Sequence, residues 1–477
     1  MALPEQLPDI SEILTLLKSA DPDELERMGE AGMVEAFQSA AEEVPAYKDL
    51  LQKRGVDVAQ VTDIAALRRI VPLIDKTSIF QPYEIADLCR HGSLADIKGI
   101  LPSSGHSGVF AFSVNTVKNV QNTARMVDLA LEYCLNIFGK NTLLVNTYPM
   151  GVNVHTSLPV ANTGVNIDIA LAIVRKFASA YEQLVVVGQP LFLKRLVEDG
   201  LHHGVDWAGL NTSVVTGGEG FSESWRTYMS SLIGIKDPDR PTDRFVASSM
   251  GIGEVDLNVF HEIPDTIRIV RAAYRYRPLR RALFGDNVEV PPLFFVYYPM
   301  RTFVEEIPVA DSAVGELAIS LLSPDIRNPL IRYKTGDRVK VLPYRALEKI
   351  LAQHGGIPAP ALHMPIVMVF GRKETVVTRK GPVHAETVKE AVFRERDVAE
   401  AITGFFKMVG AGGELRVEVQ LRDGLVPVRR LQNLLAASLE ACLPGVPFQA
   451  VLHGFKDYPF STSYERKYPY IDKPSNP

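Results

Sequence analysis

The sequence predicts an α/β fold, in which helices flank a largely parallel sheet. The chain has 477 residues, of which 46% are hydrophobic, so it can bury more than one apolar core and is expected to form two or three domains. Between residues 142 and 248, short β-branched runs alternate with amphipathic stretches of about a dozen residues. This alternation is typical of βαβ units, and open sheets of this kind bind ligands at the carboxyl ends of their strands.

The N-terminal part of the chain is predicted to be helical. Residues 9–55 carry apolar side chains three and four positions apart, which is the spacing of one helix face. The small residues of segment 103–113 interrupt this pattern. A further helix is expected over residues 116–137, because Gly139 follows it as a stop signal.

The alternating region contains four predicted strands and two predicted helices. Ser222, followed by Glu223, has the chemistry of a helix N-cap. Two loops, at Gly217 and Ser249, are expected to follow strands directly. The strands are predicted over residues 142–146, 183–187, 213–216 and 244–248, and the helices over residues 191–202 and 222–233.

The pattern changes in the second half of the chain. Residues 293–341 suggest antiparallel strands, which could form a small barrel or a distorted sheet. Beyond Gly371, a tail of about a hundred residues mixes strands and helices and is long enough for a separate α+β domain. Within it, strands are predicted over residues 375–378, 415–421 and 448–452, and helices over residues 385–393 and 429–442.

Composition excludes several classes of protein. The net charge is -5, and no basic block with interleaved aromatic residues is present, so DNA and RNA are not expected as partners. Cys89, Cys134 and Cys442 are too few and too widely spaced for a disulfide framework or a thiol-rich zinc site. The N-terminus does not resemble a signal peptide, and no apolar run reaches membrane-spanning length. We therefore expect a cytoplasmic protein that does not bind a membrane.

One Gly-rich segment has the composition of a phosphate-binding loop. Ser103-Ser-Gly-His-Ser-Gly108 offers three hydroxyls, an imidazole and two glycines within six residues. Glycines let backbone N–H groups approach a polyphosphate, and hydroxyls donate to its oxygens. The lysine of the G-x-x-x-x-G-K-[ST] loop is missing. On its own, such a segment is more often a plain surface turn.

Other segments offer groups that suit a nucleotide. Segment 332–338 contains Asp337, whose carboxylate could accept both hydroxyls of a ribose, although a solvated hairpin turn is the alternative. The glycines of segment 216–220 could let a flat base lie on the backbone. Glu254 could bind Mg²⁺ through oxygen, although a lone glutamate is more often structural. Segment 371–374 could be only a polar turn before a strand.

Taken in order, these segments resemble the adenylate-forming superfamily, specifically its phenylacetate–CoA ligase-like branch. Pro329-Leu-Ile-Arg-Tyr-Lys-Thr-Gly-Asp337 is the most specific of them. The resemblance implies a large N-terminal domain, residues 1–373, with mostly parallel sheets, flanking helices and a small antiparallel β region. It also implies a small mobile α+β domain, residues 374–477. The other segments that carry it are Val44–Tyr47, Val71–Lys76, Ser103–Gly108, Thr216–Gly220, Met250–Glu254, Gly315–Ile319 and Gly371–Glu374.

The resemblance implies a role for each matching residue. Glu254 would help to hold Mg²⁺, Asp337 would bind the ribose, Arg372 would contact ribose or phosphate, and Glu374 would be the hinge between the domains. The phosphates would be held by Ser103, Ser104, Gly105, His106, Ser107 and Gly108. The adenine would be lined by Gly218, Glu219, Ser249, Met250 and Gly251.

The chain also departs from the family pattern. His106 and Ser107 replace threonines of the phosphate loop, and Val109-Phe110 replace Lys-Pro, which removes a cation. Segment 250–254 lacks both the aromatic residue that packs against adenine and the hydroxyl beside the glutamate.

The catalytic lysine of the family is also displaced. Segment 461–473 ends in the family's Ile-Asp-Lys, and an ungapped match puts Arg466 in the lysine's place, with Lys467 beside it. Either cation could reach a phosphate and act in catalysis, or the pair could simply be solvated.

Two further expectations concern zinc and the acyl pocket. Some relatives carry cysteines suited to zinc, but this chain has His261-Glu262 at the first place and the cysteine-free segment 347–360 at the second, so no zinc is expected. In such enzymes, the region around His155 lines the acyl pocket. The residues that could shape this pocket are Tyr148, Asn153, His155 and Phe221. A purely structural role for His155 is an equal alternative.

The leading hypothesis is an AMP-forming ligase. ATP would activate a carboxylic acid, preferably aromatic, as acyl-AMP with release of pyrophosphate, and the acyl group would pass to CoA. The alternatives are an amine acceptor, which makes an amide synthetase, nitrite as the activated acid, which makes a diazotising enzyme, or a non-catalytic nucleotide-binding relative. The expected ligands are ATP, Mg²⁺, CoA and a small-molecule acid; the oligomeric state, a homodimer included, is open.

Overall fold

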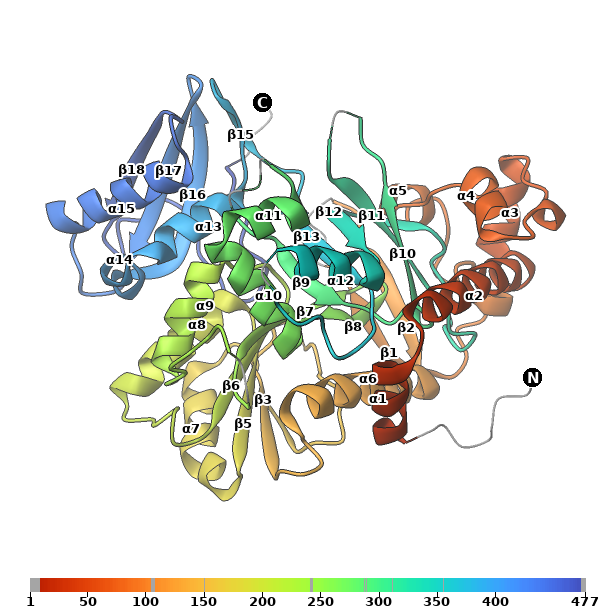
Figure 1. The fold of residues 1–477 in the computed structure, drawn as a ribbon, viewed down its shortest axis with the longest axis horizontal. Coiled ribbons are helices and arrows are strands. Elements are labelled where there is room, and N and C mark those ends of the chain that lie inside the picture. The colour runs from red at the N-terminus through yellow and green to blue at the C-terminus, as the bar shows by residue number, and fades with distance from the viewer. Residues whose placement is uncertain are drawn as a thin grey trace.

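An eleven-stranded sheet forms the centre of the molecule. The computed structural model describes residues 9–103, 108–149, 151–240, 243–286, 288, 290–310, 312–354 and 356–472. The order of the strands in the sheet is β10-β11-β12-β13-β9-β8-β7-β6-β5-β3-β4. One half of this sheet is parallel and the other is antiparallel, so the predicted α/β class is confirmed (Figure 1).

The parallel half is buried on both faces, as its continuous apolar strands require. In β5, Leu184 and Val186 join one core with α7, α8 and α9, while Val185 and Val187 join another with α6 and α10. The strands are β3 (Thr142–Asn146), β4 (Val160–Asn162), β5 (Gln183–Gly188), β6 (Thr212–Thr216) and the first part of β7 (Val246–Ile252). The helices are α6 (Val117–Leu135), α7 (Ile167–Phe177), α8 (Pro190–His202), α9 (Glu223–Leu232), α10 (Pro264–Arg275) and α11 (Arg277–Phe284).

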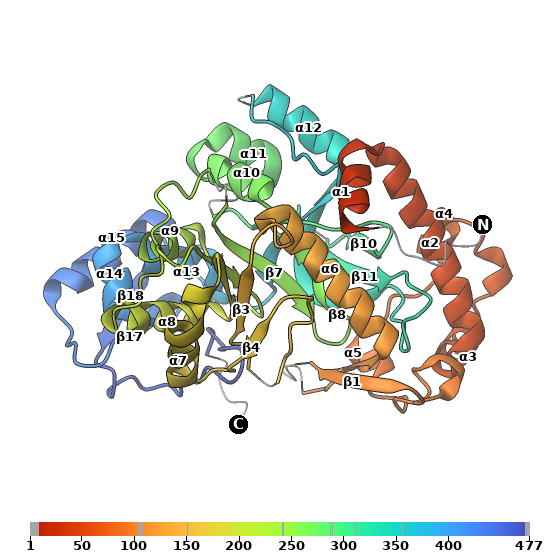
Figure 2. The same ribbon diagram turned by 90° about the horizontal axis from the view of Figure 1, so that it is seen from below.

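The antiparallel strands predicted for residues 293–341 are present, and they continue the large sheet rather than close into a small barrel. Ser249 and Met250, expected in a loop, lie in β7, which pairs in parallel with β6 and then in antiparallel fashion with β8. This one strand therefore joins the two halves, and α6 crosses beside their junction (Figure 2). The strands are β8 (Asp256–His261), β9 (Leu293–Val296), β10 (Thr302–Ile307), β11 (Gly315–Leu321), β12 (Tyr333–Leu342) and β13 (Ile366–Arg372).

The N-terminal helices cover the antiparallel half. Apolar residues of α2, α3 and α4, among them Phe37 and Leu67, share a core with Ile319 and Val339 of the sheet. Between this region and α6, the two-stranded hairpin of β1 (Ile97–Pro102) and β2 (Phe112–Thr116) stands apart. The helices on this face are α2 (Pro22–Glu43), α3 (Pro45–Lys53), α4 (Ile64–Ile70) and α5 (Lys76–Ile79), and the opposite face carries α1 (Ile10–Ser19) and α12 (Tyr344–Gln353).

The strands after Glu374 form two smaller sheets, and α13 packs against α9 of the large domain (Figure 1). The sequence interpretation missed β16, because Gly404 and Lys407 interrupt its apolar run; Gly404 has a φ of 95° beside a register shift. The elements are β14 (Val376–Thr378), β15 (Gly381–Val383), α13 (Ala385–Arg394), α14 (Arg396–Ala401), β16 (Ile402–Ala411), β17 (Glu414–Leu421), α15 (Arg429–Cys442) and β18 (Phe448–His453). The boundary at 373/374 and the mobility of this domain stay predictions.

Within the described part of the chain, no helix combines the length and the apolar character that crossing a bilayer requires.

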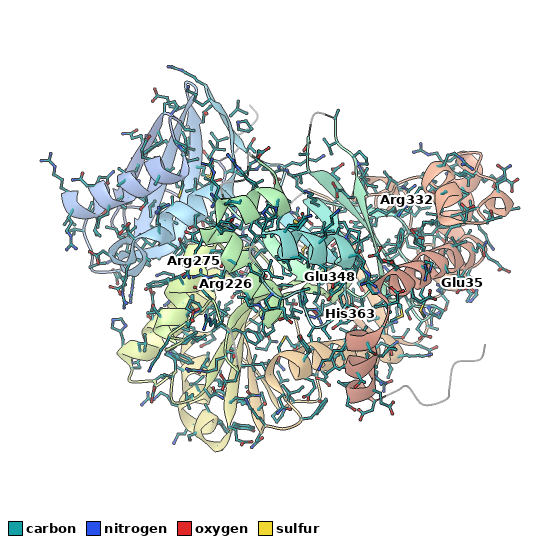
Figure 3. The ribbon with its side chains drawn as sticks, viewed as in Figure 1. Glu35, Arg226, Arg275, Arg332, Glu348 and His363 are labelled. Carbon is teal, nitrogen blue, oxygen red and sulfur yellow. The ribbon has the colours of Figure 1, made fainter. Side chains whose placement is uncertain are left out.

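A buried ion pair ties segment 332–338 to the neighbouring strands and helices. The Arg332 guanidinium, labelled in Figure 3, lies 2.9 Å and 3.0 Å from the two carboxylate oxygens of Glu305 and donates to the carbonyl of Arg68. Both side chains of the pair are buried. Arg332 therefore serves the packing of β12 and does not line the cavity described below.

Replacing Arg332 with Met should lower the free energy of unfolding of the large domain by about 3 kcal/mol, because it leaves a buried carboxylate without its main partner. The matched control is Glu348→Ala, which breaks an exposed pair with Arg345 and should cost about 0–1 kcal/mol. Urea unfolding followed by the fluorescence of Trp207 and Trp225 measures both variants. Equal urea midpoints for the two variants would show that the buried Arg332–Glu305 pair stabilises the fold no more than the exposed pair does.

Candidate active site

One cavity of about 760 Å³ gathers most of the residues that the sequence singled out. It lies beyond the carboxyl ends of β3, β5 and β6 and is lined from both domains. This is the edge at which open α/β sheets bind ligands. The predicted site residues that line it are Ser103, Tyr148, His155, Gly218, Glu219, Phe221, Ser249, Met250, Gly251, Glu254, Asp337, Arg372, Glu374 and Lys467.

The candidate phosphate loop is the tip of the β1–β2 hairpin. Ser103 is buried at its start, where its backbone N–H donates to the Ala111 carbonyl over 2.8 Å and its hydroxyl accepts from the Ala111 N–H over 3.0 Å. Four of the predicted loop residues, Ser104, Gly105, His106 and Ser107, lie outside the described residues. Gly108, at the other end of the tip, is exposed and is not part of the cavity lining.

The loop after β6 forms a flat wall of the cavity. A Cβ atom at Gly217 would overlap the hydroxyl of Tyr148, so only glycine fits there. Gly218 has a φ of 87°, a conformation that also favours glycine. Met250 and Gly251 line the neighbouring wall from β7.

Glu254 is buried and held by two neighbours. The Tyr333 hydroxyl donates to Oε1 of Glu254 over 2.7 Å, and Nζ of Lys76 lies 3.2 Å from the same oxygen. Burial and this carboxylate raise the pKa of Tyr333 well above its usual value, so the phenol keeps its proton as a donor.

Lys76 ends the matching segment Val71–Lys76, and no role was predicted for it from the sequence. Its position follows from backbone pairing: the N–H of Ile74 donates to the Arg332 carbonyl, and the N–H of Lys334 donates to the Ile74 carbonyl. Helix α5 begins at Lys76, with Asp75 as the N-cap, and this side chain also lines the cavity. It thus brings a cation to the side of the cavity near the hairpin loop, which lacks the family lysine.

Asp337 and Arg372 lie side by side on paired strands. They are opposite each other in the register of β12 and β13, and Nε of Arg372 is 3.4 Å from Oδ1 of Asp337. The hairpin-turn alternative for Asp337 is wrong: the residue is buried within β12, next to a bulge that turns it toward the cavity. Gly371 has a φ of 86°, and a Cβ atom there would overlap the carboxylate of Glu386, which brings the small domain close to this strand end.

Of the two candidate cations near the C-terminus, Lys467 lines the cavity and Arg466 is exposed. The chain on either side is anchored by Tyr464 and Tyr468, whose rings both pack on Phe405. Burial lowers the pKa of Lys467 and the Arg372 guanidinium lowers it further, while the carboxylates of Asp337, Glu219 and Glu254 oppose this shift. The cavity lining thus favours Lys467 over Arg466, and the catalytic role of either residue stays a prediction.

An apolar chamber adjoins the polar part of the cavity. Tyr148, His155 and Phe221 line it, together with apolar residues of α6 such as Val127 and Leu131. Asn153, predicted with them, is exposed and outside the lining, because its neighbours Val152 and Val154 take the inward positions of this stretch.

The wall behind Phe221 is held by a buried charge cluster. The Arg226 guanidinium, labelled in Figure 3, lies 4.8 Å from the centre of the Phe221 ring and 2.7 Å from Oε1 of Glu262, and it also pairs with Glu223. Glu262 and its neighbour His261 are the two residues considered in the zinc expectation. His261 faces Tyr298, and burial lowers its pKa to about 4, so the imidazole is neutral.

No protein-family model matches the sequence, and no curated protein matches it. Solved structures do. The chain is similar to 2-hydroxyisobutyryl-CoA ligase in the postadenylation state in complex with R3-HIB-AMP, with a TM-score of 0.72 and 12% identity over 100% of this chain and 95% of that one. Against the same ligase with 2-HIB-AMP and CoA in the thioesterification state, the TM-score is 0.58 with 12% identity over 99% and 94% of the chains.

The predicted resemblance is thus confirmed at the level of the fold. The structural similarity extends over nearly the whole chain. The TM-score is higher for the postadenylation structure than for the thioesterification structure. The chain has, along its whole length, the fold of the adenylate-forming acyl-CoA ligases.

Proposed function

We propose that the protein is an AMP-forming ligase that activates a carboxylic acid with ATP and passes the acyl group from acyl-AMP to CoA. The observation that carries this proposal is the grouping of Lys467, Asp337 and Glu254 in one cavity that opens into an apolar chamber. The ligase structures with similar folds hold acyl-AMP and CoA, which supports the same order of steps for this chain.

In the first step, a carboxylate oxygen of the acid attacks the α-phosphorus of ATP. The P–O bond to the β-phosphate breaks, pyrophosphate leaves, and negative charge accumulates on the phosphoryl oxygens. Cations placed beforehand in a cavity stabilise that charge most effectively, because they need no reorganisation. Lys467, Lys76 and Arg372 are the cations in this role, and Asp337 accepts hydrogen bonds from the ribose hydroxyls.

The residues present also fit Mg²⁺ bound together with ATP. Proteins commonly hold this ion through one or two carboxylates plus the phosphates of the substrate. Among the described residues, no group of three or more His, Cys, Asp or Glu could hold a metal ion by itself. Glu254 would supply the protein oxygen, while Tyr333 and Lys76 hold its carboxylate in place. When bound, the ion neutralises charge on the triphosphate.

The apolar chamber indicates the class of acid. Its walls come from α6, β3 and β8, where Val127, Leu131, Leu144 and Leu257 present aliphatic surface. Phe221 and Tyr148 add aromatic rings to the lining. An acid with an apolar body, such as an arylcarboxylic acid, matches this lining better than a small polar acid does.

The proposed function is tested by pyrophosphate release from ATP and Mg²⁺ across a panel of aryl acids, aliphatic acids and nitrite. We expect release with at least one aryl or other apolar acid, and equal consumption of CoA. Release without CoA consumption would overturn the proposed acceptor in favour of an amine, and release only with nitrite would overturn the proposed acid. ATP binding without release for any acid would favour a non-catalytic nucleotide-binding protein.

Neutralising Lys467 should lower the turnover of the adenylation step by about 100-fold or more, because a cation in direct reach of the reacting phosphate is lost. Lys467→Ala is the variant, and ATP–pyrophosphate exchange is the measurement. Arg466→Ala is the matched control: this neighbour is exposed, and its exchange rate should stay within about twofold. A larger loss of exchange in Arg466→Ala than in Lys467→Ala would instead support Arg466 as the catalytic cation.

The burial of Lys467 predicts the alkaline side of the pH profile. A lowered pKa means that the amine loses its proton, and its positive charge, below the usual value of 10.5. For adenylation, kcat/KM for ATP should therefore fall with rising pH earlier than a solvent-exposed lysine would allow. Lys467→Arg keeps its charge at these pH values, so its profile should lose this alkaline limb. An unchanged limb in that variant would assign the titration to another group.

A further inference from the structure

Two residues outside the predicted machinery, Lys389 and Tyr470, join the C-terminal part of the chain to Glu219, a predicted site residue in the loop after β6. Lys389 lies on α13 and Tyr470 lies near the end of the described chain, both in the small domain. Glu219 lies in the large domain, in the loop that lines the proposed base side of the cavity. We call these three residues the domain latch.

Lys389 is the centre of the latch. Its Nζ donates to the Gly220 carbonyl over 2.8 Å and lies 3.5 Å from Oε2 of Glu219. The same Nζ lies 4.3 Å from the centre of the Tyr470 ring. Side-chain exposure is 9% for Lys389 and 10% for Glu219, so both charges are largely withdrawn from water. Such a pair keeps its position, because separating its members would leave a buried charge unpaired.

Tyr470 completes the latch from the side of Lys467. Its phenol interacts with the Glu219 carboxylate, and burial together with that carboxylate raises the pKa of the phenol well above its usual value. Its ring packs on Phe406 with centroids 4.6 Å apart. The backbone beside it is fixed as well, because the N–H of Met408 in β16 donates to the Tyr470 carbonyl over 2.7 Å.

Tyr470 is only three residues from Lys467 on the same segment, so a contact at Tyr470 limits where Lys467 can lie. At most about 10 Å of extended chain separates the two positions. The loop that carries Glu219 and Gly220 is therefore linked, through two side chains of the small domain, to the segment that carries the proposed catalytic cation.

We propose that the domain latch positions Lys467 for adenylation: Glu219 and Lys389 hold Tyr470, and Tyr470 holds the segment that presents Lys467 to the α-phosphate. This inference rests on the proposed function for its kinetic consequence, and on geometry alone for its effect on domain closure. The latch residues act through Lys467 and are positioning residues. A rotation of the small domain away from this arrangement has to break the contacts of Lys389 with Gly220 and Glu219 and the contact of Tyr470 with Glu219.

The sharpest variant is Tyr470→Phe. It removes the hydroxyl that interacts with Glu219, and it keeps the ring that packs on Phe406 and lies beneath the Lys389 amine. Removing Lys389 or Glu219 instead would leave a buried charge alone and could unfold the interface. The matched control is Tyr344→Phe, because Tyr344 is also a buried tyrosine with one hydrogen bond, to the Pro360 carbonyl, and lies outside the cavity.

A double-mutant cycle separates positioning from packing. Tyr470→Phe should lower kcat for ATP–pyrophosphate exchange by roughly 10- to 100-fold, since a small misplacement of a catalytic group costs this much, and should leave KM for ATP within about threefold. In the Lys467→Ala background the same substitution should have no further effect, because the group it positions is gone. Equal losses in both backgrounds, or no loss in either, would overturn the inference. Tyr344→Phe should behave as the wild-type protein does.

Limited trypsin digestion tests the latch without relying on the chemistry. Arg372 and Lys373, at the junction of the domains, are about half exposed and are cleavage sites for trypsin. Tyr470→Phe should increase the rate of cleavage there severalfold over the wild-type protein and over Tyr344→Phe, because a weaker latch lets the domains separate more often. Unchanged cleavage would refute the latch even if the protein activates no acid. Increased cleavage of Tyr470→Phe, in a protein that releases no pyrophosphate with any acid, would refute the proposed function. It would still support the domain latch as the contact that holds the two parts of the chain together.

Discussion

The structure of this site depends on one partly buried lysine, Lys467, that shares a cavity with the Asp337 and Glu254 carboxylates and with the Arg372 guanidinium. Lys467 comes from the small domain, while the carboxylates of Asp337 and Glu254 come from the large one. Withdrawing an ammonium group from water is costly unless anions or hydrogen bonds replace the solvent. The residues that line the cavity come from both sides of Glu374 in the sequence, so the packing of the C-terminal part of the chain against the large sheet also completes the cavity.

The large sheet explains why those carboxylates meet. β7 belongs to the parallel half at its start and to the antiparallel half at its end, so Glu254 follows the point at which the two halves join. Asp337 reaches the same place from β12, through a bulged register with β11 and β13. Glu254 and Asp337, 83 positions apart, thus converge because the sheet continues without a break across its parallel and antiparallel parts. The N-terminal segment that carries Lys76 pairs its backbone with β12 at Ile74.

Local sequence patterns predicted the elements whose hydrophobic periodicity or capping residue is unambiguous. The strand at 183–187 and the helix at 191–202 follow directly from their hydrophobic periodicity, and Ser222 caps α9 as its side-chain chemistry suggests. The long strand β16 was missed, because a glycine with positive φ and an inward lysine break its pattern. The continuity of the sheet could not be read from local patterns at all, because strand pairing between distant segments is decided by tertiary packing.

The candidate site was predictable to the extent that its residues belong to short, recognisable segments. Asp337, Arg372 and Glu254 were placed by such segments, and all three line the cavity. The choice between Arg466 and Lys467 was not predictable, since a shift of one residue turns a side chain from one face of an extended chain to the other. Lys389 and Tyr470 carry no signal in isolation. Their role arises only where α13 and the final segment meet the loop after β6.

The central claim is that distant segments of this chain form one nucleotide cavity, and calorimetric titration with ATP and Mg²⁺ tests it most directly. We expect one molecule of ATP to bind per chain, and Asp337→Ala to weaken that binding about tenfold or more through the loss of charged hydrogen bonds to the ribose. Absence of heat with the wild-type protein, or equal affinity in the two proteins, would contradict the account.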